Sequence, residues 1–465
     1  YRLRTLVLEA NNDVANATTK ANSAILHAGY DPEPGTKMAA LNVEGNRMAL
    51  DICRKLDVPV RQTGSMVLAF APGQLPHLQM LYDRGVANGV PGLELLSGDA
   101  ARALEPNLSE KVCGALLAPS AAVVDPWGLA LAMIEVAVQN GVELRRSAPV
   151  TGIRPKEGGG FVLATPKGEV ETRFVVNSAG VDADRVHRLL EPIPWQTRPN
   201  RGEYYLLDKS EGGRVSRVIF QCPGPEGKGV LVAPTVHGNL IVGPNAEPVT
   251  DRRDLGNTAA GLAFVKARAV QSVPSIRFGE NIRNFSGIRA NTDQSDFLIQ
   301  WSEIHPGFLD LAGIKSPGLT SAPAIGKLAA DMLGEAGLPL AQKPDFIDER
   351  HVVRFRHASP AEKAALIARD PRYGRVICRC ETITEGEILD AIHSPVGATT
   401  VNGVKRRCNA GRGRCQGGFC GPRVQAILAR ELGVSPTEIL MDQAGSWVLC
   451  GETKQSVTEE VSPHD

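Results

Sequence analysis

The sequence lacks a net charge, a long apolar run and a secretory leader. It contains 51 Lys and Arg against 51 Asp and Glu, so no overall field directs the chain toward nucleic acid or an anionic membrane. No uninterrupted apolar stretch approaches the ~18 residues that a membrane-spanning helix needs. No basic segment followed by an apolar stretch marks a signal peptide. The expected compartment is therefore the cytoplasm, with any peripheral membrane association arising through a partner.

The chain is too long for one core. Its 465 residues predict two or three domains, and 43% hydrophobic and 22% charged residues are ordinary for a globular protein. Strand patterns alternate with helical ones and are interrupted by strand-rich stretches. This order predicts the α/β class, in which a Rossmann-like nucleotide-binding domain carries an inserted, mostly β substrate domain. Toward the C-terminal end, helical patterns surround cysteine-bearing loops and predict a small helical domain.

These patterns place the expected boundaries. Residues 1–340 form the nucleotide-binding domain with its insertion, and residues 341–374, which lack clear periodicity, form a linker. Residues 375–432 form the cysteine-bearing domain, and residues 433–465 are expected to be a C-terminal helical tail.

An apolar strand at residues 3–9 is already in progress at the first residue and ends in Glu9. In a dinucleotide-binding unit, a carboxylate at this place takes the ribose hydroxyls, although a solvated carboxylate at a strand end is the alternative. A Gly-x-Gly-x-x-Gly turn, expected about twenty residues earlier, is not present. We therefore expect such a turn within about thirty residues before Tyr1.

The nine cysteines are unevenly distributed. Three are scattered, and the other six lie between Cys378 and Cys450. A secreted disulfide framework would spread its cysteines more evenly through a small chain. The clustering therefore predicts metal ligation.

Two close pairs stand out among the six, Cys378 with Cys380 and Cys415 with Cys420. Four thiolates suit a metal or a cluster that takes four sulfur ligands. Nearby glycines expose N–H groups that can bond to sulfur, and nearby cations balance a negative cluster. These residues are Gly411, Gly413, Gly417, Gly418, Gly421, Lys405, Arg406, Arg407, Arg412 and Arg414. A structural zinc site, which also accepts four thiolates, is the alternative.

The pattern Cys-x-Cys followed by Cys-x4-Cys-Gly-Pro, with Arg-Cys-Gln-Gly-Gly-Phe before the last cysteine, resembles the bacterioferritin-associated-ferredoxin-type [2Fe–2S] domain. It is most similar to the version fused to large subunits of anaerobic glycerol-3-phosphate dehydrogenases and related flavoproteins. The resemblance implies four cluster ligands: Cys378, Cys380, Cys415 and Cys420. Cys408 is expected to be a free thiol, with an alternative ligand as the other interpretation. Cys450 lies beyond the match and is expected to be an ordinary thiol.

A second resemblance begins with the hydroxyl-rich segment at residues 18–23, which is followed by His27-Ala28-Gly29. It is similar to the segment after the ribose-binding strand in the glycine oxidase and D-amino-acid oxidase superfamily. The glycerol-3-phosphate and L-2-hydroxyglutarate dehydrogenase branches are the most similar. The resemblance implies FAD as cofactor, contacts from Thr18, Thr19 and Ser23, and a position near the flavin for His27. A loop histidine bonded to backbone is the alternative.

Two further motifs extend the superfamily resemblance to residues 3–335. The strand running into Ala179-Gly180 resembles its strand-Ala-Gly motif, and residues 311–323 resemble its closing flavin motif. The helix after the closing motif is expected to be capped by Thr320 or Ser321 and to direct its positive end at the flavin. The cofactor contacts implied outside the hydroxyl-rich segment are Glu9, Val150, Ala179, Gly180, Gly313, Gly318, Leu319 and Thr320.

The segment Phe285-Ser286-Gly287-Ile288-Arg289 matches the superfamily's Gly-hydrophobic-Arg element. An arginine there can hold a carboxylate or phosphate with two bonds and orient the donor carbon over flavin N5. A surface arginine at a strand end is the alternative. Lys315 is expected near flavin N5, where a cation stabilises the reduced flavin.

These resemblances imply an FAD-dependent dehydrogenase with a [2Fe–2S] relay. Substrate carbon gives a hydride to FAD, a base such as His27 takes the hydroxyl proton, and electrons leave singly toward a second flavoprotein or electron-accepting subunit. The relay favours a dehydrogenase over an oxidase that uses oxygen.

The expected substrate is a small anion, favoured to be glycerol 3-phosphate, which would give dihydroxyacetone phosphate. A 2-hydroxy acid such as 2-hydroxyglutarate, or an amino acid, is the alternative, because one arginine does not separate phosphate from carboxylate. From another class, a non-catalytic iron–sulfur scaffold or redox-sensing subunit stays open. A plain ferredoxin-like carrier is disfavoured, because it would leave most of the chain without a role.

Overall fold

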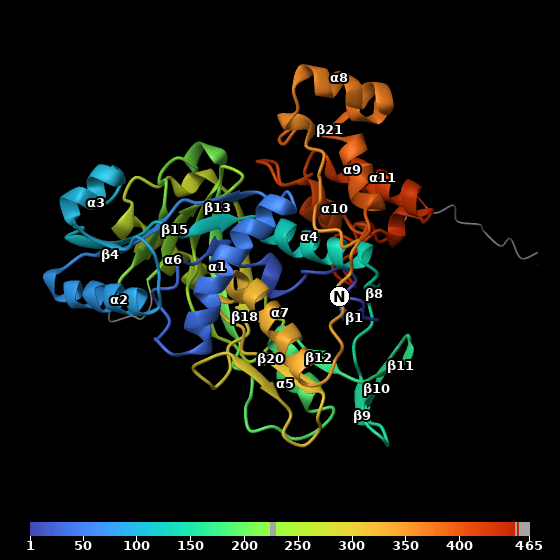
Figure 1. Cartoon of the computed structure of the whole chain (residues 1–465). Helices are drawn as coiled ribbons and strands as arrows, with labels where there is room; N and C mark the ends of the chain where they lie inside the picture. The colour runs from blue at the N-terminus through green and yellow to red at the C-terminus, as the bar shows by residue number, and fades with distance from the viewer. Residues whose placement is uncertain (224–228, 452, 455–465) are drawn as a thin grey trace, which may run out of the picture. The chain divides into compact units, whose positions relative to one another are not determined.

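The computed structural model describes residues 1–223, 229–451 and 453–454. The chain divides into two compact units, Tyr1–Val352 and Val353–Asp465, and Figure 1 labels their helices and strands. The helices of the first unit are α1 (Lys37–Lys55), α2 (Leu75–Ala87), α3 (Gly98–Leu104), α4 (Pro126–Gln139), α5 (Ala183–His187), α6 (Ala259–Ser272) and α7 (Gly318–Glu335). Its strands are β1 (Leu6–Leu8), β2 (Ile25–Leu26), β3 (Val60–Arg61), β4 (Ser65–Ala69), β5 (Glu94–Ser97), β6 (Gly114–Ala118), β7 (Ala122–Val124), β8 (Glu143–Arg145), β9 (Gly152–Pro155), β10 (Phe161–Thr165), β11 (Gly168–Thr172), β12 (Val175–Asn177), β13 (Asn200–Leu207), β14 (Val218–Gln221), β15 (Leu231–Pro234), β16 (Leu240–Gly243), β17 (Glu247–Pro248), β18 (Asn281–Arg289), β19 (Leu298–Trp301) and β20 (Phe308–Ala312).

The nucleotide-binding part of this unit is built from parallel strand pairs. β1 pairs with β8, and β12 pairs with β20, which also pairs with antiparallel β19. Because β12 and β20 run in parallel, the loops after them leave from the same edge of the sheet. Helices α1 and α7 pack against each other, and a Cβ on Gly45 of α1 would lie 2.3 Å from the Thr320 carbonyl oxygen. Only glycine allows this approach.

The substrate part is a nine-stranded, mostly antiparallel sheet. Its order is β17-β13-β16-β15-β14-β4-β6-β5, with β18 pairing β13 along its length. One face of the sheet carries an apolar core that includes fully buried Met66, Leu207, Ile219 and Leu240. Burial of such side chains contributes about 1.5–3 kcal/mol each. This well-packed sheet therefore holds the β18 side chains in fixed positions.

The second unit is small and mainly helical. Its elements are α8 (Pro360–Arg369), β21 (Val376–Cys378), β22 (Ile383–Thr384), α9 (Glu385–His393), α10 (Val401–Cys408) and α11 (Gly421–Leu432). Ile388, Val404 and Leu428 are fully buried in its core together with Cys378 and Cys420. A capping box between Thr384 and Glu387 starts α9.

The expected class is confirmed: an α/β unit with a β-rich insertion, followed by a small helical domain. The expected helical tail at 433–465 is wrong in its described part, which holds a 3-10 turn at Pro436–Glu438 and a bridge between Leu440 and Trp447. A Ser435–Glu438 capping box forms there, but the segment pairs with itself instead of extending the helix. Residues 452 and 455–465 of that prediction lie outside the described residues.

The segment 341–374, expected as a linker, spans the division between the units and contains α8. A capping box between Ser359 and Glu362 starts this helix, a signal that apolar periodicity does not reveal. The boundaries of the functional domains stay a prediction. Across residues 1–223, 229–451 and 453–454, no helix has the combined length and apolar character required to cross a bilayer.

Candidate functional site

His27 follows β2 and is held through its backbone by two helices. Its N–H donates to the Thr320 hydroxyl of α7 at 2.9 Å. Its carbonyl accepts from the side-chain amides of Asn42 at 2.8 Å and Asn46 at 3.1 Å, both on α1. All three partners are buried. The backbone of His27 is therefore fixed on both sides, and only its ring can reorient.

The half-buried ring of His27 rests on an aromatic side chain. It stacks on Phe220 of β14, an interior strand of the substrate sheet, with centroids 5.8 Å apart and planes at 28°. Its Nε2 lies 3.4 Å from the Ser316 hydroxyl, in the turn before α7. The ring therefore faces the closing motif, while its backbone bonds also fit the alternative interpretation. A position near the flavin stays a prediction for this residue.

The expected cap of α7 is wrong. The helix begins at Gly318 after Pro317, and no side chain caps it. The Thr320 hydroxyl instead bridges to β2, accepting from His27 and donating to the Ile25 carbonyl at 3.3 Å. Ser321 donates back to the Pro317 carbonyl at 3.3 Å. Both hydroxyls lie inside the first turns. The Thr320 hydroxyl joins the helix to β2, whereas the Ser321 hydroxyl bonds within the start of its own helix.

The hydroxyl-rich segment packs against β18. Thr18 donates to the Ile288 carbonyl at 2.7 Å, one residue before Arg289. A Cβ on Gly287 would lie 1.9 Å from the Ala21 carbonyl oxygen, so only glycine lets the two segments meet. The structure thus brings the predicted cofactor segment and the predicted anion-binding arginine together.

Ser23 and Thr19 are two other residues of the hydroxyl-rich segment for which cofactor contacts are predicted. The Ser23 hydroxyl is 3.3 Å from the Tyr204 hydroxyl, and the Tyr204 ring stacks on Phe285 at 4.7 Å. Thr19 lies half-buried in the 3-10 turn Thr18–Lys20. Their contacts with a cofactor stay predictions.

Arg289 is anchored between β13 and the loop after β16. One guanidinium nitrogen donates to Asn200 Oδ1 at 2.5 Å, and another donates to the Asn245 carbonyl at 3.1 Å. A Cβ on Gly202 would lie 2.9 Å from the guanidinium, so glycine makes room for it. The anchored guanidinium has five N–H donors, so donors beyond these two bonds are available to hold an anion.

Lys315 lies in the same turn as Ser316. Its ammonium donates to the Gln294 carbonyl at 3.0 Å. A position near flavin N5 stays a prediction for this residue.

The edge formed by β12 and β20 exposes backbone to an approaching ligand. Asn177 of β12 lies opposite Asp310 of β20 and donates to its carboxylate at 2.8 Å. Ala179 and Gly180 follow, and Gly180 has φ +61° with no heavy atom within 4 Å of the place a Cβ would take. Gly313, which follows β20, has φ +64°. Two left-handed glycines at one sheet edge provide the close backbone approach that a nucleotide needs.

Glu9 lies at the end of β1. Its Oε1 accepts from the Asn11 backbone N–H at 2.7 Å and side-chain amide at 3.0 Å. Burial raises the pKa of Glu9, although the Asn11 bonds oppose this shift. The carboxylate is held in place by its own loop, and its contact with a ribose stays a prediction.

The remaining predicted cofactor residues have packing roles. Val150 contacts the apolar cluster that contains Ile153 and Leu8. Leu319 packs against the cluster beneath α1, and Gly318 opens α7. FAD fits the combination of the Glu9 carboxylate, the hydroxyl-rich segment at residues 18–23, and the two left-handed glycines Gly180 and Gly313.

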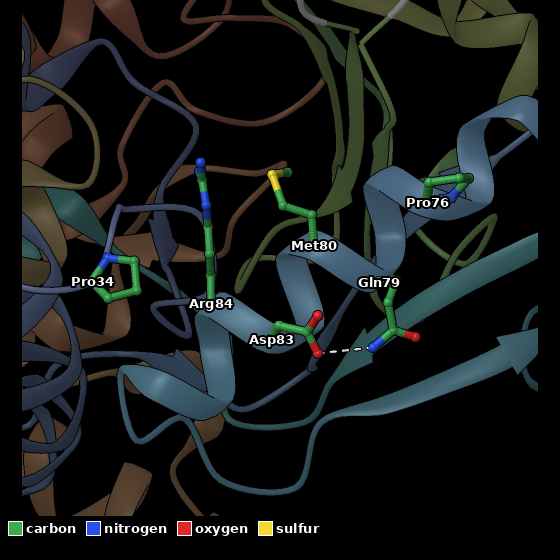
Figure 2. Close-up of a pocket in the computed structure, with 6 residues that line it drawn as sticks. All are labelled: Pro34, Pro76, Gln79, Met80, Asp83 and Arg84. Carbon is green, nitrogen blue, oxygen red and sulfur yellow. Dashed lines mark hydrogen bonds between the residues drawn. The ribbon is translucent and has the colours of Figure 1, made fainter.

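A hollow of about 500 Å³ lies on the surface of α2. Figure 2 shows its lining residues, Pro34, Pro76, Gln79, Met80, Asp83 and Arg84, with Gln79 bonded to Asp83. None of the predicted flavin or substrate residues lines it. We assign it no function.

The cysteine site of the second unit consists of two thiol pairs. Cys380 and Cys415 have sulfurs 3.5 Å apart, and the Cys378 and Cys420 thiols are hydrogen-bonded to each other. The second pair is buried and the first exposed. Two pairs are the arrangement expected when each iron of a [2Fe–2S] cluster takes two cysteine sulfurs.

Backbone N–H groups converge on these sulfurs. The N–H groups of Phe419 and Gly417 bond to Cys415 and lower the pKa of its thiol. The bond from Cys420 lowers the pKa of Cys378 to about 6, with help from the Gly411 N–H. Such donors stabilise thiolate charge in iron–sulfur sites. The four cysteines therefore fit the cluster implied by the resemblance.

Glycine also sets the space around the pairs. A Cβ on Gly413 would lie 2.3 Å from the Cys380 Cβ. Cys408 belongs to neither pair. It donates to the Val404 carbonyl at 3.3 Å, and burial raises its pKa to about 12. Cys450 is exposed. Within the described part of the chain, no three or more His, Cys, Asp or Glu side chains form a site suited to one metal ion.

Several residues at the site were not predicted from the sequence. Asn42 and Asn46 are spaced four apart on the buried face of α1, a signal of a structural amide pair that could have been recognised. Phe220 and Asn200 come from distant strands and Asn245 from the loop after β16, and none of them carries a local signal. Their roles depend on the folded sheet.

Comparisons with known proteins agree with a flavin site in the first unit and an iron–sulfur site in the second. Residues 1–332 match the family model "FAD dependent oxidoreductase", and residues 376–430 match "BFD-like [2Fe-2S] binding domain". The chain is 47% identical to a glycerol 3-phosphate dehydrogenase from Caloramator mitchellensis, covering 98% of this chain and 95% of that protein.

Other relatives match the first unit. The chain is 29% identical to an L-2-hydroxyglutarate dehydrogenase from Escherichia coli over 52% of this chain and 58% of that protein. The structure of dithionite-reduced L-alpha-glycerophosphate oxidase from Mycoplasma pneumoniae, with FAD bound, superposes with a TM-score of 0.72 at 27% identity. That match covers 76% of this chain and 93% of the oxidase.

Proposed function

Because the chain belongs to the FAD-dependent oxidoreductase family and carries a BFD-like [2Fe–2S] binding domain, we propose that it is a glycerol 3-phosphate dehydrogenase. It oxidises glycerol 3-phosphate to dihydroxyacetone phosphate and passes electrons through the [2Fe–2S] cluster to a partner. The observation that carries this proposal is the 47% identity to a glycerol 3-phosphate dehydrogenase over 98% of the chain, which includes the cysteine domain.

His27 takes the proton of the substrate hydroxyl. Its backbone is fixed by Thr320, Asn42 and Asn46, so its Nε2 is held in one region beside Ser316. An imidazole held in a fixed position suits this proton transfer. Phe220 beneath the ring excludes water from one of its faces.

Arg289 binds the phosphate of the substrate. Asn200 and the Asn245 carbonyl orient its guanidinium, so the remaining N–H groups present a fixed fork. A fork of this kind holds phosphate or carboxylate with two bonds and positions the distant carbon. The same geometry supports a 2-hydroxy acid as the second candidate substrate, in line with the L-2-hydroxyglutarate dehydrogenase relative.

FAD, when bound, accepts the hydride from the substrate carbon. The residues that would hold it are Glu9, Thr18, Thr19, Ser23, Val150, Ala179, Gly180, Gly313, Gly318, Leu319 and Thr320. Lys315 would place a cation near its reacting end.

In the second unit, Cys378, Cys380, Cys415 and Cys420 hold the [2Fe–2S] cluster. A one-electron relay in the same chain favours a protein acceptor, either a second flavoprotein or another electron-accepting subunit, over direct use of oxygen. The free thiols and the cluster suit a reducing compartment, so we place the enzyme in the cytoplasm, with any membrane association through its partner.

Anaerobic stopped-flow mixing with a substrate panel tests the proposal. Glycerol 3-phosphate is expected to bleach the flavin absorption faster than L-2-hydroxyglutarate, glycine or L-proline. Bleaching by L-2-hydroxyglutarate alone would make the second candidate correct. Iron–sulfur absorption without any extractable flavin would instead favour a scaffold or redox-sensing role.

A further inference from the structure

The cysteine site of the second unit has one exposed edge. Cys378 and Cys420 lie within the apolar core of that unit, each 1% exposed, whereas Cys380 and Cys415 are at its surface. Electron transfer slows steeply with distance. The edge at Cys380 and Cys415 is therefore where a cluster held by these four sulfurs is most accessible to an acceptor.

A cationic aromatic patch lies beside this edge. Phe419 immediately precedes Cys420 and is 42% exposed. The Arg379 guanidinium lies 4.5 Å from the Phe419 ring centroid, and the Arg423 guanidinium lies 5.1 Å from it. We call these three residues the Arg379–Phe419–Arg423 pad. Both arginines are exposed and are held next to the cysteine edge by the same ring.

Several other arginines of the unit have their charge balanced by carboxylates. Arg375 and Arg430 both pair with Glu385. Within the described residues, neither Arg379 nor Arg423 forms an ion pair. The pad therefore combines uncompensated positive charge with an exposed aromatic ring, at the place where the cluster is most accessible.

We propose that the Arg379–Phe419–Arg423 pad is the docking surface for a separate acidic redox protein that takes electrons from the cluster. This inference rests on the proposed function and adds the exit face and the charge of the acceptor. Arginine and aromatic residues are enriched in protein interfaces, and complementary charge accelerates encounter. Oxidation of one alcohol group to a ketone releases two electrons and two protons. Two acceptor molecules are thus each reduced by one electron, and the protons leave to solvent.

Binding without turnover gives the first test. Cytochrome b5, a haem protein with an acidic haem edge, and cytochrome c, whose haem edge is basic, serve as oxidised probes in calorimetry at low salt. The full chain is expected to bind cytochrome b5 in preference to cytochrome c. The double variant Arg379→Glu/Arg423→Glu is expected to weaken cytochrome b5 binding at least ~10-fold, and Arg423→Glu alone is expected to give a smaller loss.

The control variant makes the same change of charge elsewhere in the unit. Lys363 and Arg369 of α8 also lie over aromatic rings, those of Phe355 and Tyr373. Lys363→Glu/Arg369→Glu is expected to bind cytochrome b5 like the unmodified chain. Iron content and visible absorption of each variant verify that the cluster is intact. Since Arg379 lies between two ligands, Arg423→Glu provides the result if the double variant loses iron.

Kinetics separate this inference from the proposed function. Protein reduced with dithionite, and freed of excess reductant by gel filtration, is mixed with cytochrome b5. Pad variants are expected to slow this second-order reaction at least ~10-fold and to weaken its salt dependence. Pad-dependent transfer from chemically reduced protein, combined with no flavin bleaching by glycerol 3-phosphate, would leave the docking surface standing and refute the proposed substrate.

Two results would overturn the inference. The first is unchanged cytochrome b5 binding and reduction in the Arg423→Glu and double variants with intact clusters. The second is a slower transfer from flavin to cluster after mixing with substrate, with cytochrome b5 reduction by prereduced protein unaffected. That second result would mean that the pad serves the chain's own flavin half.

Discussion

The two units assemble their sites in opposite ways. In the first unit, His27 is fixed by Thr320, 293 residues away in the sequence, and Arg289 by Asn200, 89 residues away. In the second unit, the Cys415 sulfur accepts from the N–H groups of Gly417 and Phe419, its near neighbours in the chain. The first site therefore depends on the packing of a whole sheet and two helices. The second depends on local loop conformation and on glycines that leave room for sulfur.

The largest effect should come from removing a cluster ligand. Cys420→Ser is expected to abolish iron binding and iron–sulfur absorption, because one iron loses a thiolate. Cys408→Ser is the matched control, since Cys408 lies in the same core and its thiol bonds to the backbone of Val404 and Ala410. Iron analysis and visible circular dichroism measure both. Loss of the cluster in Cys408→Ser would contradict the ligand assignment.

His27→Gln is expected to affect the first unit alone. Loss of the base should lower kcat/KM for glycerol 3-phosphate ~10²–10⁴-fold, with iron content unchanged. Steady-state assays with an artificial dye measure the rate. His305→Gln, in the loop before β20, is the control and should change kcat/KM little. An unchanged rate in His27→Gln would exclude His27 as the base.

Arg289→Lys is expected to raise KM more than it lowers kcat, because lysine cannot reproduce the two-bond fork. An increase of about 10-fold to 100-fold corresponds to the loss of one charged hydrogen bond. Arg283→Lys, on the exposed face of the same strand, is the control. Equal effects on both variants would mean that Arg289 is a surface arginine and does not bind the substrate.

Gly413→Ala tests whether the second unit has room for a side chain at this position. The new methyl group would meet the Cys380 Cβ at 2.3 Å, so we expect a loss of about 1–3 kcal/mol in the stability of the second unit. Gly421→Ala is the control, since nothing lies within 4 Å of that position. Hydrogen exchange followed by mass spectrometry resolves peptides of each unit. Faster exchange confined to the first unit would contradict the prediction.

The smallest effect concerns pH and the first unit. Burial alone would lower the pKa of His187, but its bonds to Asp310 at 2.6 Å and Glu191 at 3.0 Å outweigh burial and raise it. A raised pKa in the folded state adds stability that is complete below ~6.5, the ordinary histidine value. This contribution is lost as pH rises through the folded pKa.

The difference in urea midpoint between the unmodified chain and His187→Gln isolates this contribution. It should shrink as pH rises from ~6. A difference that is constant or grows with pH would contradict the sign of the pKa shift.

The difference between the units also explains what the sequence could predict. Cysteine spacing singled out all four sulfurs, because they lie in two short segments, but it did not predict their pairing. The structure pairs Cys380 with Cys415 and Cys378 with Cys420, one cysteine from each segment. In the first unit, the local pattern placed His27 but not Phe220 beneath it, because that contact joins distant strands. The expected Thr320 cap was wrong for the same reason: a distant strand provides a better partner for the hydroxyl.

The ends of several helices also follow signals in the local sequence. The apolar spacing at residues 36–56 coincides with α1, and Pro126 and the Asn140-Gly141 pair lie at the two ends of α4. Helix α8 was not predicted, because a capping box and not apolar periodicity determines its start. The helical tail was expected to be longer than the single 3-10 turn at Pro436–Glu438.

Anaerobic addition of glycerol 3-phosphate, followed by electron paramagnetic resonance, tests the central claim most directly. The claim is that one chain oxidises this substrate in its flavin half and reduces its own [2Fe–2S] cluster. The account predicts bleaching of the flavin absorption together with the signal of a reduced [2Fe–2S] cluster, which Cys420→Ser abolishes and Cys408→Ser preserves. Flavin bleaching without that signal, or zinc in place of iron in the purified protein, would contradict it.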